Sequence, residues 1–222
     1  MSIPFLRRFA LCLVAVGGLA AFADAEPTHA QSVPSIEERT DGMQRIEGFF
    51  DLYWDEATGS LFWEIERLDE EFIWQISMGS GLGSNPIGID RGQLRGTYVL
   101  AARRVGPKVL LIEPNYRYVA NTANALEVQA VRDAFAPSVH WGFDVEAQSG
   151  SRVLVDATPF FLSDSRDVIG QIQRSGQGTF TLDASRSVIH MPAVQGFPEN
   201  TEIAARLTRT RRNPGGLGNR GA

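Results

Sequence analysis

Short runs of alternating apolar and polar residues recur along most of this chain, and residues that favour turns separate them. A period of two is typical of β-strands that have one side toward a core and the other toward solvent. Such runs occupy residues 48–54, 60–65, 71–78, 96–103, 108–113, 139–147, 152–157, 178–182 and 187–193. Most of the connections are short enough for antiparallel pairing, and the loop that ends near Gly59 predicts a β-hairpin.

Two segments have helical spacing instead. A helix is predicted at 123–135, because apolar residues recur there at nearly helical intervals, at Ala125, Val128, Val131 and Phe135. Asn121 and Thr122 precede this helix as candidate N-caps, and a short helical turn is expected at 160–163. We expect the longer helix to cover the sheet. The fold class is therefore mainly β, an antiparallel sheet or sandwich-like domain with one or two short helices, with an α+β fold as the alternative.

The N-terminal segment has the order of a bacterial signal peptide. Arg7 and Arg8 precede an apolar run at 9–22 that ends in small residues. We expect residues 1–25 to be removed on export to the periplasm or the medium, which leaves no stable membrane span; an uncleaved N-terminal anchor is the alternative. Cys12 is the single cysteine and lies in this segment, so the mature chain has no disulfide.

The rest of the chain is expected to hold one domain. We predict a flexible linker at 26–45, a β-rich accessory domain at 46–208 and a disordered Arg/Gly tail at 209–222. From Glu26 to Ala205 the chain has 14 basic and 25 acidic residues. This negative charge repels nucleic acid, so no nucleic-acid partner is expected. The basic tail favours a truncated or frameshifted end, with a polybasic binding arm as the alternative.

Aromatic residues gather early in the chain, at Phe49, Tyr53, Trp54, Phe62, Trp63, Phe72 and Trp74. Core packing is the favoured interpretation, because aromatic residues are common in strands and bury large areas. The same cluster also fits a sugar-stacking platform in an exported binding module.

A glycine-rich loop at 79–92 follows one predicted strand and is the most unusual segment. It lacks the glycine pattern and the following helix of nucleotide-binding loops. Asn85, Asp90 and Arg91 are its candidate binding residues, for docking another domain. The competing interpretation is a long structural crossover.

The sequence contains no complete catalytic constellation. No H-E-x-x-H motif is present, so the helix that presents two histidines to zinc is missing. His140 and His190 lie on predicted strands without ligand spacing, and Ser138, His140 and Asp144 share a strand face without a nucleophile elbow. We assign no catalytic residue, no metal ligand and no cofactor to this chain.

Five segments carry a resemblance to a known family, namely 48–54, 81–92, 128–143, 154–162 and 197–202. Together they resemble the N-terminal domain of unknown function, family 5117, of bacterial secreted zinc-dependent metalloproteases. The resemblance implies a non-catalytic accessory domain whose partner is the metalloprotease catalytic domain, where the zinc is bound. The alternative is a stand-alone exported binding module for polysaccharide or peptide.

Overall fold

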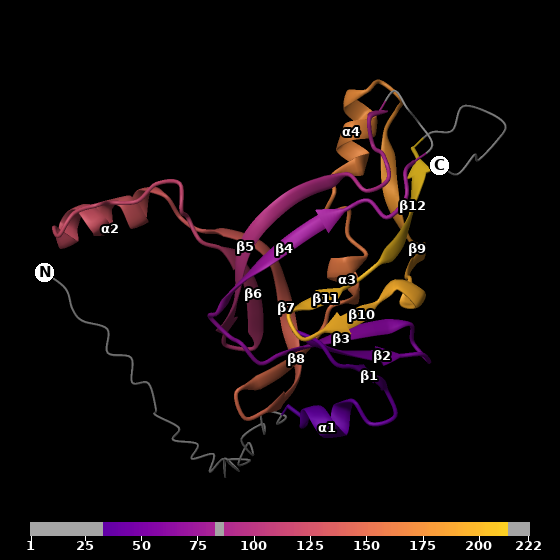
Figure 1. Cartoon of the computed structure of the whole chain (residues 1–222), viewed down its shortest axis with the longest axis horizontal. Helices are drawn as coiled ribbons and strands as arrows, with labels where there is room; N and C mark the ends of the chain where they lie inside the picture. Colours follow the sequence, from indigo (N-terminus) through magenta and orange to yellow (C-terminus); the bar gives the residue numbers. More distant parts are fainter. Residues whose placement is uncertain (1–32, 83–86, 213–222) are drawn as a thin grey trace, which may run out of the picture. The chain divides into compact units, whose positions relative to one another are not determined.

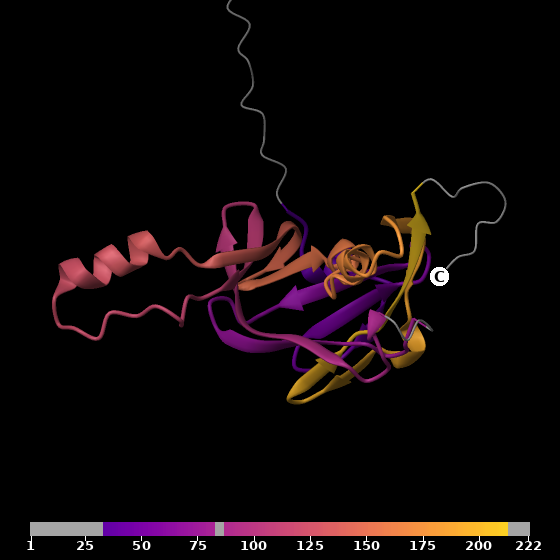
Figure 2. The ribbon, with the colours of Figure 1, turned by 90° about the horizontal axis from the view of Figure 1, so that it is seen from above.

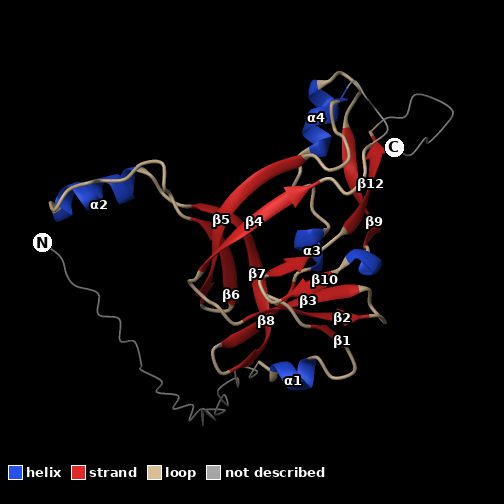
Figure 3. Ribbon diagram, in the orientation of Figure 1, coloured by secondary structure: helices blue, strands red, loops and turns tan. Residues whose placement is uncertain are grey.

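The structure is a computed structural model that describes residues 33–82 and 87–212, and these residues belong to one compact unit that begins at Val33. It is mainly β, as predicted from the alternating pattern (Figures 1 and 3). The predicted signal peptide, Asn85 and the last ten residues of the predicted tail lie outside the described residues. In the described part, none of the helices combines the length and apolar character that crossing a membrane requires.

Eight strands form one antiparallel sheet in the order β1-β2-β3-β8-β7-β6-β5-β4. They are β1 (Gln44–Ile46), β2 (Asp51–Asp55), β3 (Ser60–Ile65), β4 (Glu71–Ser77), β5 (Leu94–Val105), β6 (Lys108–Glu113), β7 (Ser138–Ser149) and β8 (Arg152–Asp156). Two small antiparallel sheets follow. One joins β9 (Phe180–Ile189) to β12 (Ala205–Arg211), and the other joins β10 (Gln195–Phe197) to β11 (Asn200–Glu202).

Four α-helices lie within the described ranges, more than the one or two expected. They are α1 (Ile36–Arg39), α2 (Ala125–Ala134), α3 (Thr158–Phe161) and α4 (Val168–Arg174), and a 3-10 turn, η2, spans Met191–Ala193. α3 overlaps the helical turn expected at 160–163, whereas α1 and α4 were missed, because one or two turns leave almost no periodicity to detect.

The large sheet is curled, so that its concave face encloses the main core. Alternate residues of the strands point inward and are almost fully buried, among them Trp63 on β3, Leu111 on β6 and Phe143 on β7. The ring of Phe50, next to β2, lies 4.9 Å from the ring of Phe72 on β4. Because β2 and β4 lie near opposite ends of the strand order, this contact requires the curl.

The convex face carries a second cluster, beneath α1. Ile36 of this helix packs with Tyr53 and Phe62. Beside them the Glu64 carboxylate, only 5% exposed, accepts bonds from the Tyr53 hydroxyl at 2.8 Å and from Arg152 at 2.7 Å. Burial, together with Glu64, raises the pKa of Tyr53 to about 12. The early aromatic residues are thus divided between two faces of the sheet, and burial of Phe62, Trp63 and Phe72 confirms their predicted core role.

Both ends of the folded unit extend beyond the predicted limits of 46 and 208. The expected linker contains α1 and the first two residues of β1, and α1 is capped by the Ser35 hydroxyl, which accepts a bond from Glu38 N. At the other end β12 continues to Arg211 because it pairs with β9. The predicted strands 178–182 and 187–193 prove to be β9 followed by η2. Cross-strand pairing, which local sequence does not reveal, accounts for these differences.

The predicted helix at 123–135 forms, but it does not cover the sheet. Figures 1 and 2 show α2 at the end of a long extension between β6 and β7, away from the strands. None of its residues is buried. Its N-cap is Asn124, whose side chain accepts a bond from Leu126 N, in place of the predicted Asn121 or Thr122.

Candidate functional site

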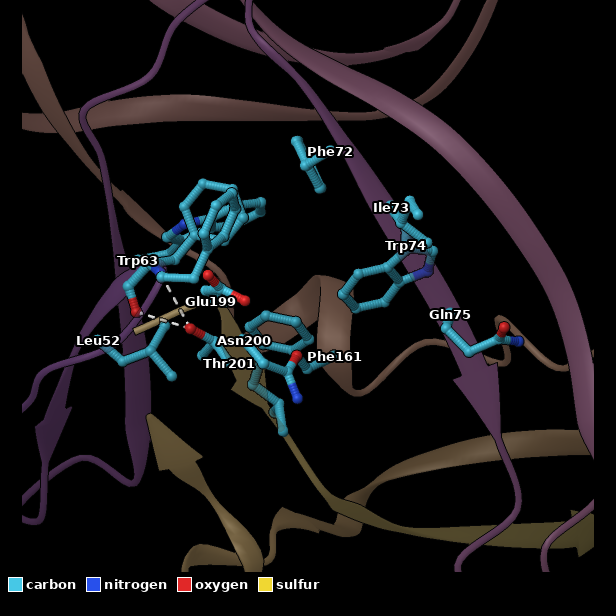
Figure 4. A pocket seen from close by; sticks show the side chains of 13 residues that line it. Leu52, Trp63, Phe72, Ile73, Trp74, Gln75, Phe161, Glu199, Asn200 and Thr201 are labelled. Atoms are coloured by element: carbon cyan, nitrogen blue, oxygen red, sulfur yellow. Dashed lines mark hydrogen bonds between the residues drawn. The ribbon is translucent and has the colours of Figure 1, made fainter. Parts of the chain in front are cut away.

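A pocket of about 330 Å³ lies where the curled sheet brings β4 close to the β2–β3 end. Figure 4 shows side chains from β2, β3, β4, α3 and the β11 region around it. We call it the seam pocket. Its lining residues are Phe49, Phe50, Leu52, Trp63, Phe72, Ile73, Trp74, Gln75, Phe161, Glu199, Asn200, Thr201 and Ile203. Most of them are apolar, which is typical of a site that binds an apolar group.

The aromatic walls of the seam pocket pack edge to face. The Phe50 ring lies 4.8 Å from the Trp63 ring at 72°, and 4.9 Å from the Phe72 ring at 80°. These two edge-to-face arrangements satisfy the ring quadrupoles and fix this wall. On the other side the Trp74 ring lies 6.0 Å from that of Phe161, which α3 supplies, and the two rings are tilted by 31°. The result is a recess between rings and not a flat aromatic platform.

The β10–β11 hairpin forms one rim of the pocket because two close contacts hold it against the chain before β2. Thr201 Oγ1 accepts a bond from Phe50 N at 2.9 Å and donates to Phe50 O at 3.1 Å (Figure 4). At Gly196 an added Cβ would lie 1.9 Å from Glu47 O. Only glycine permits this approach, so any side chain at 196 would push the rim away.

Two polar features distinguish the seam pocket from ordinary core. Trp63 Nε1 is buried and has no hydrogen-bond partner among the described residues, although a buried indole N–H usually finds one. Glu199 is the single ionisable side chain among the lining residues, and it is exposed at the rim. The pocket therefore offers an apolar interior, one unused donor and one negative charge.

A second candidate surface is the arm, which we define as residues 114–137 with α2 at its centre. It exposes large apolar side chains, with Leu126 at 79% and Val119 at 69%. Within the arm, the rings of Tyr118 and Phe135 stack 4.1 Å apart at 13°. At its base the Tyr116 hydroxyl donates to the Glu71 carboxylate on β4. The arm is thus attached to the sheet while its apolar residues stay exposed.

The glycine-rich loop connects β4 to β5, which are neighbours in the sheet, so the predicted crossover is instead a hairpin connection. Ile89 is buried against Val168 and Ile172 of α4. Asp90 and Arg91 are both exposed, as a docking role requires. Neither side chain forms a hydrogen bond or ion pair with the described residues. Asn85, the third candidate, lies outside them.

The two histidines of the described part, His140 and His190, do not come together. His140 Nε2 lies 2.6 Å from Glu113 Oε2, while His190 Nε2 lies 3.4 Å from Arg206 Nη2. The possible triad does not assemble either, because Asp144 pairs with Lys108 at 2.7 Å. Across 33–82 and 87–212, no group of three or more His, Cys, Asp or Glu side chains is arranged to hold a metal ion.

The curled antiparallel sheet and its seam pocket define the chain as a mainly β domain with a candidate binding recess. The family model described as a domain of unknown function, DUF5117, matches residues 92–220, more than half of the chain. The chain therefore belongs to the DUF5117 family. No curated protein and no solved structure matches it. The match begins just before β5, so it includes the arm and the β10–β11 rim but not β1 to β4.

Sequence reasoning anticipated only part of the seam pocket. Phe49, Trp63, Phe72 and Trp74 belong to the early aromatic cluster and were assigned to packing. The rim residues at 199–203 were missed, because β10 and β11 have three residues each and leave no periodic signal. The signal that was available is Gly196, an isolated glycine within an extended segment, which often marks a close backbone approach.

Proposed function

We propose that this chain is a non-catalytic N-terminal accessory domain of a secreted zinc metalloprotease, and that it docks on the protease catalytic domain. Membership of the DUF5117 family supports the domain assignment, and the resemblance described above supplies the protease link. The zinc and the catalytic residues belong to the partner domain in this proposal. Export through the N-terminal signal is part of it.

One observation carries this proposal, namely the exposure of the arm. Ala125, Val128, Val131 and Phe135 form the apolar positions of an amphipathic helix, yet α2 has no buried residue. A helix this short is marginal in water without a packing partner. Exposed apolar residues grouped on one element mark an interaction site more often than an idle surface. The arm is therefore the favoured docking element.

Asp90 and Arg91 are proposed as a secondary docking contact. They are exposed and charged, but they offer no apolar area, and exposed charge pairs typically contribute at most about 1 kcal/mol. In this proposal they influence orientation and association rate more than affinity.

The test is a binding titration between this domain and a separately produced catalytic domain from a family member that contains both. The variant Leu126→Lys should weaken association about tenfold or more, since a central apolar contact is lost. Its melting temperature should stay close to that of the unmodified domain, because Leu126 is exposed. Val188→Lys, on β9 and exposed at 56%, is the matched control, because Val188 belongs neither to the arm nor to the seam pocket.

Two results would contradict the proposal. Failure of the unmodified domain to associate with any such catalytic domain would refute the accessory role. If Leu126→Lys leaves binding unchanged while the double variant Asp90→Ala/Arg91→Ala weakens it, the docking surface is the glycine-rich loop and not the arm.

A stand-alone binding module is the second candidate function, and the seam pocket is the observation that favours it. Of the two ligand classes considered, peptide fits better than polysaccharide. Sugar rings stack on exposed aromatic faces, whereas the rings here are packed edge to face around a recess.

A further inference from the structure

The seam pocket lies along the open edge of a strand. Side chains alternate between the two faces of a sheet, so a pocket on one face is lined by every second residue of a strand. The seam pocket is lined by four consecutive residues of β4, from Phe72 to Gln75. It therefore lies beside β4, whose other edge is paired with β5. Figure 4 shows β4 running past the labelled side chains in this way.

The two edges of the large sheet differ in their protection. The β1 edge is three residues long and carries Arg45, and short or charged edges resist pairing with other chains. The β4 edge has seven residues, with no charge and no proline from Phe72 to Ser77, and it exposes Ile73 at 71%. The bulge residue Gly96 in this pair belongs to β5, so it does not protect β4. An edge of this kind is suited to pairing.

We propose that β4 accepts an extended peptide as an additional strand, with a large apolar side chain of the peptide seated in the seam pocket and a basic residue next to it. Along β4, one residue in two directs its N–H and C=O toward the open edge, and an added strand hydrogen-bonds these groups. The apolar walls of the seam pocket favour a large apolar side chain of the peptide at this position. This inference does not depend on the protease link.

The unused donor and the local charge favour a peptide over a purely apolar ligand. Trp63 Nε1–H lacks an acceptor, and a buried unsatisfied donor is unfavourable by about 1–3 kcal/mol. A peptide can supply a carbonyl oxygen as well as an apolar side chain, whereas a hydrocarbon cannot. At the rim, Glu199 attracts a basic residue, and the negative charge of the surrounding chain acts in the same direction.

The test uses the end-capped peptide TKVFTVT, whose lysine and phenylalanine lie two positions apart and so on the same face of the strand. It is titrated into the full chain with tryptophan fluorescence as the readout, because Trp63 and Trp74 line the pocket. Replacing the central phenylalanine of the peptide by alanine should weaken binding about tenfold or more. Two further peptides carry N-methyl groups that remove backbone N–H donors, one along one edge of the strand and the other along the opposite edge. Their affinities should differ. One should lose about tenfold or more in affinity, and the other should bind nearly as well as the parent.

The charge preference has its own matched pair of variants. Glu199→Gln should reduce affinity for the lysine-containing peptide and leave affinity for its norleucine analogue unchanged. Glu202→Gln, also exposed on the hairpin but absent from the pocket lining, should change neither. Trp74→Ala should abolish binding, with Trp54→Ala as the control for losing a partly buried tryptophan on another strand.

If Trp74→Ala fails to fold, the peptide analogues still decide the question. Absence of binding by every peptide up to millimolar concentration would overturn the proposal. Equal weakening by the two N-methylated peptides would also overturn it, since strand addition uses one edge. The chain could instead dimerise through this edge. If Ile73→Lys abolishes a dimer with which the peptide does not compete, the β4 edge is assigned to a second copy of the chain. If the chain does not bind the peptides but does bind a protease catalytic domain, this inference fails and the proposed function stands.

Discussion

The concave face of the sheet and the arm use the same kinds of residue but bury them to different degrees. Phe143 on β7 is 3% exposed and contacts the rings of Trp63 and Phe160. Phe135, at the end of α2, is 39% exposed and contacts the ring of Tyr118. Apolar periodicity predicted both elements, yet only one of them is packed against the domain. Periodicity therefore shows that an element needs a partner surface, without showing which molecule supplies it.

The two phenylalanines provide the most direct test of this difference. Phe143→Ala should lower the free energy of unfolding by about 3–5 kcal/mol, because it removes buried area and leaves a cavity. Phe135→Ala removes one stacked pair and should lower it by about 1 kcal/mol. Urea denaturation of both variants measures the two values. A loss at Phe135 as large as that at Phe143 would show that the arm is part of the folding core.

The sheet was predictable because its information is local. Six of the eight strands of the large sheet, from β3 to β8, lie within two residues of their predicted limits, since alternation and turn residues mark each one. The curl was not predictable, because it depends on contacts such as that between Phe50, next to β2, and Phe72 on β4, which is not adjacent to β2 in the sheet. The seam pocket is a consequence of the curl, so its walls were visible in the sequence only as aromatic residues. Asp90 and Arg91 were identified as surface residues, but nothing in the sequence shows what they contact.

A second comparison concerns charges on paired strands. Arg209 of β12 is 6% exposed and bonds Asp164 at 2.6 Å, whereas Lys108 of β6 bonds Asp144 in an exposed pair. Arg209→Met should lower stability by about 3 kcal/mol, because the Asp164 carboxylate loses its buried partner. Lys108→Met should lower it by no more than about 1 kcal/mol. Thermal melting of both variants at neutral pH compares the two losses of stability. Equal effects would mean that the β9–β12 pair is open to water and that the fold ends before β12.

The smallest expected effect concerns α1, which lies outside the sheet like the arm but, unlike α2, buries a residue, Ile36, against it. The Ser149 hydroxyl donates to Glu37 at 2.5 Å and Arg152 bonds it at 2.7 Å. Three hydrogen bonds lower the pKa of the Glu37 carboxyl from 4.5 to about 2. The bond from Ser149 has the largest effect, followed by the backbone bond of Glu37 itself and the bond from Arg152. A carboxylate with a lowered pKa stabilises the fold above its unfolded pKa, and this contribution disappears as the pH falls from about 4.5 to about 2.

Glu37→Gln should therefore be less stable than the unmodified chain at neutral pH, and the difference should vanish toward pH 2. Glu38→Gln is the matched control, because both carboxylates lie in the first turn of α1 and feel the same helix dipole. The difference in stability is measured from urea denaturation midpoints between pH 2 and pH 7. Amide hydrogen exchange of residues 36–40 reports on α1 itself. In the arm, Glu127→Gln should lower the urea midpoint at neutral pH by less than Glu37→Gln does, since Glu127 bonds only the side chain of Asn124 within the described chain. A loss of stability at Glu127 equal to that at Glu37 would mean that the arm is held to the sheet as firmly as α1, and it would remove the physical basis for treating the arm as a free docking element.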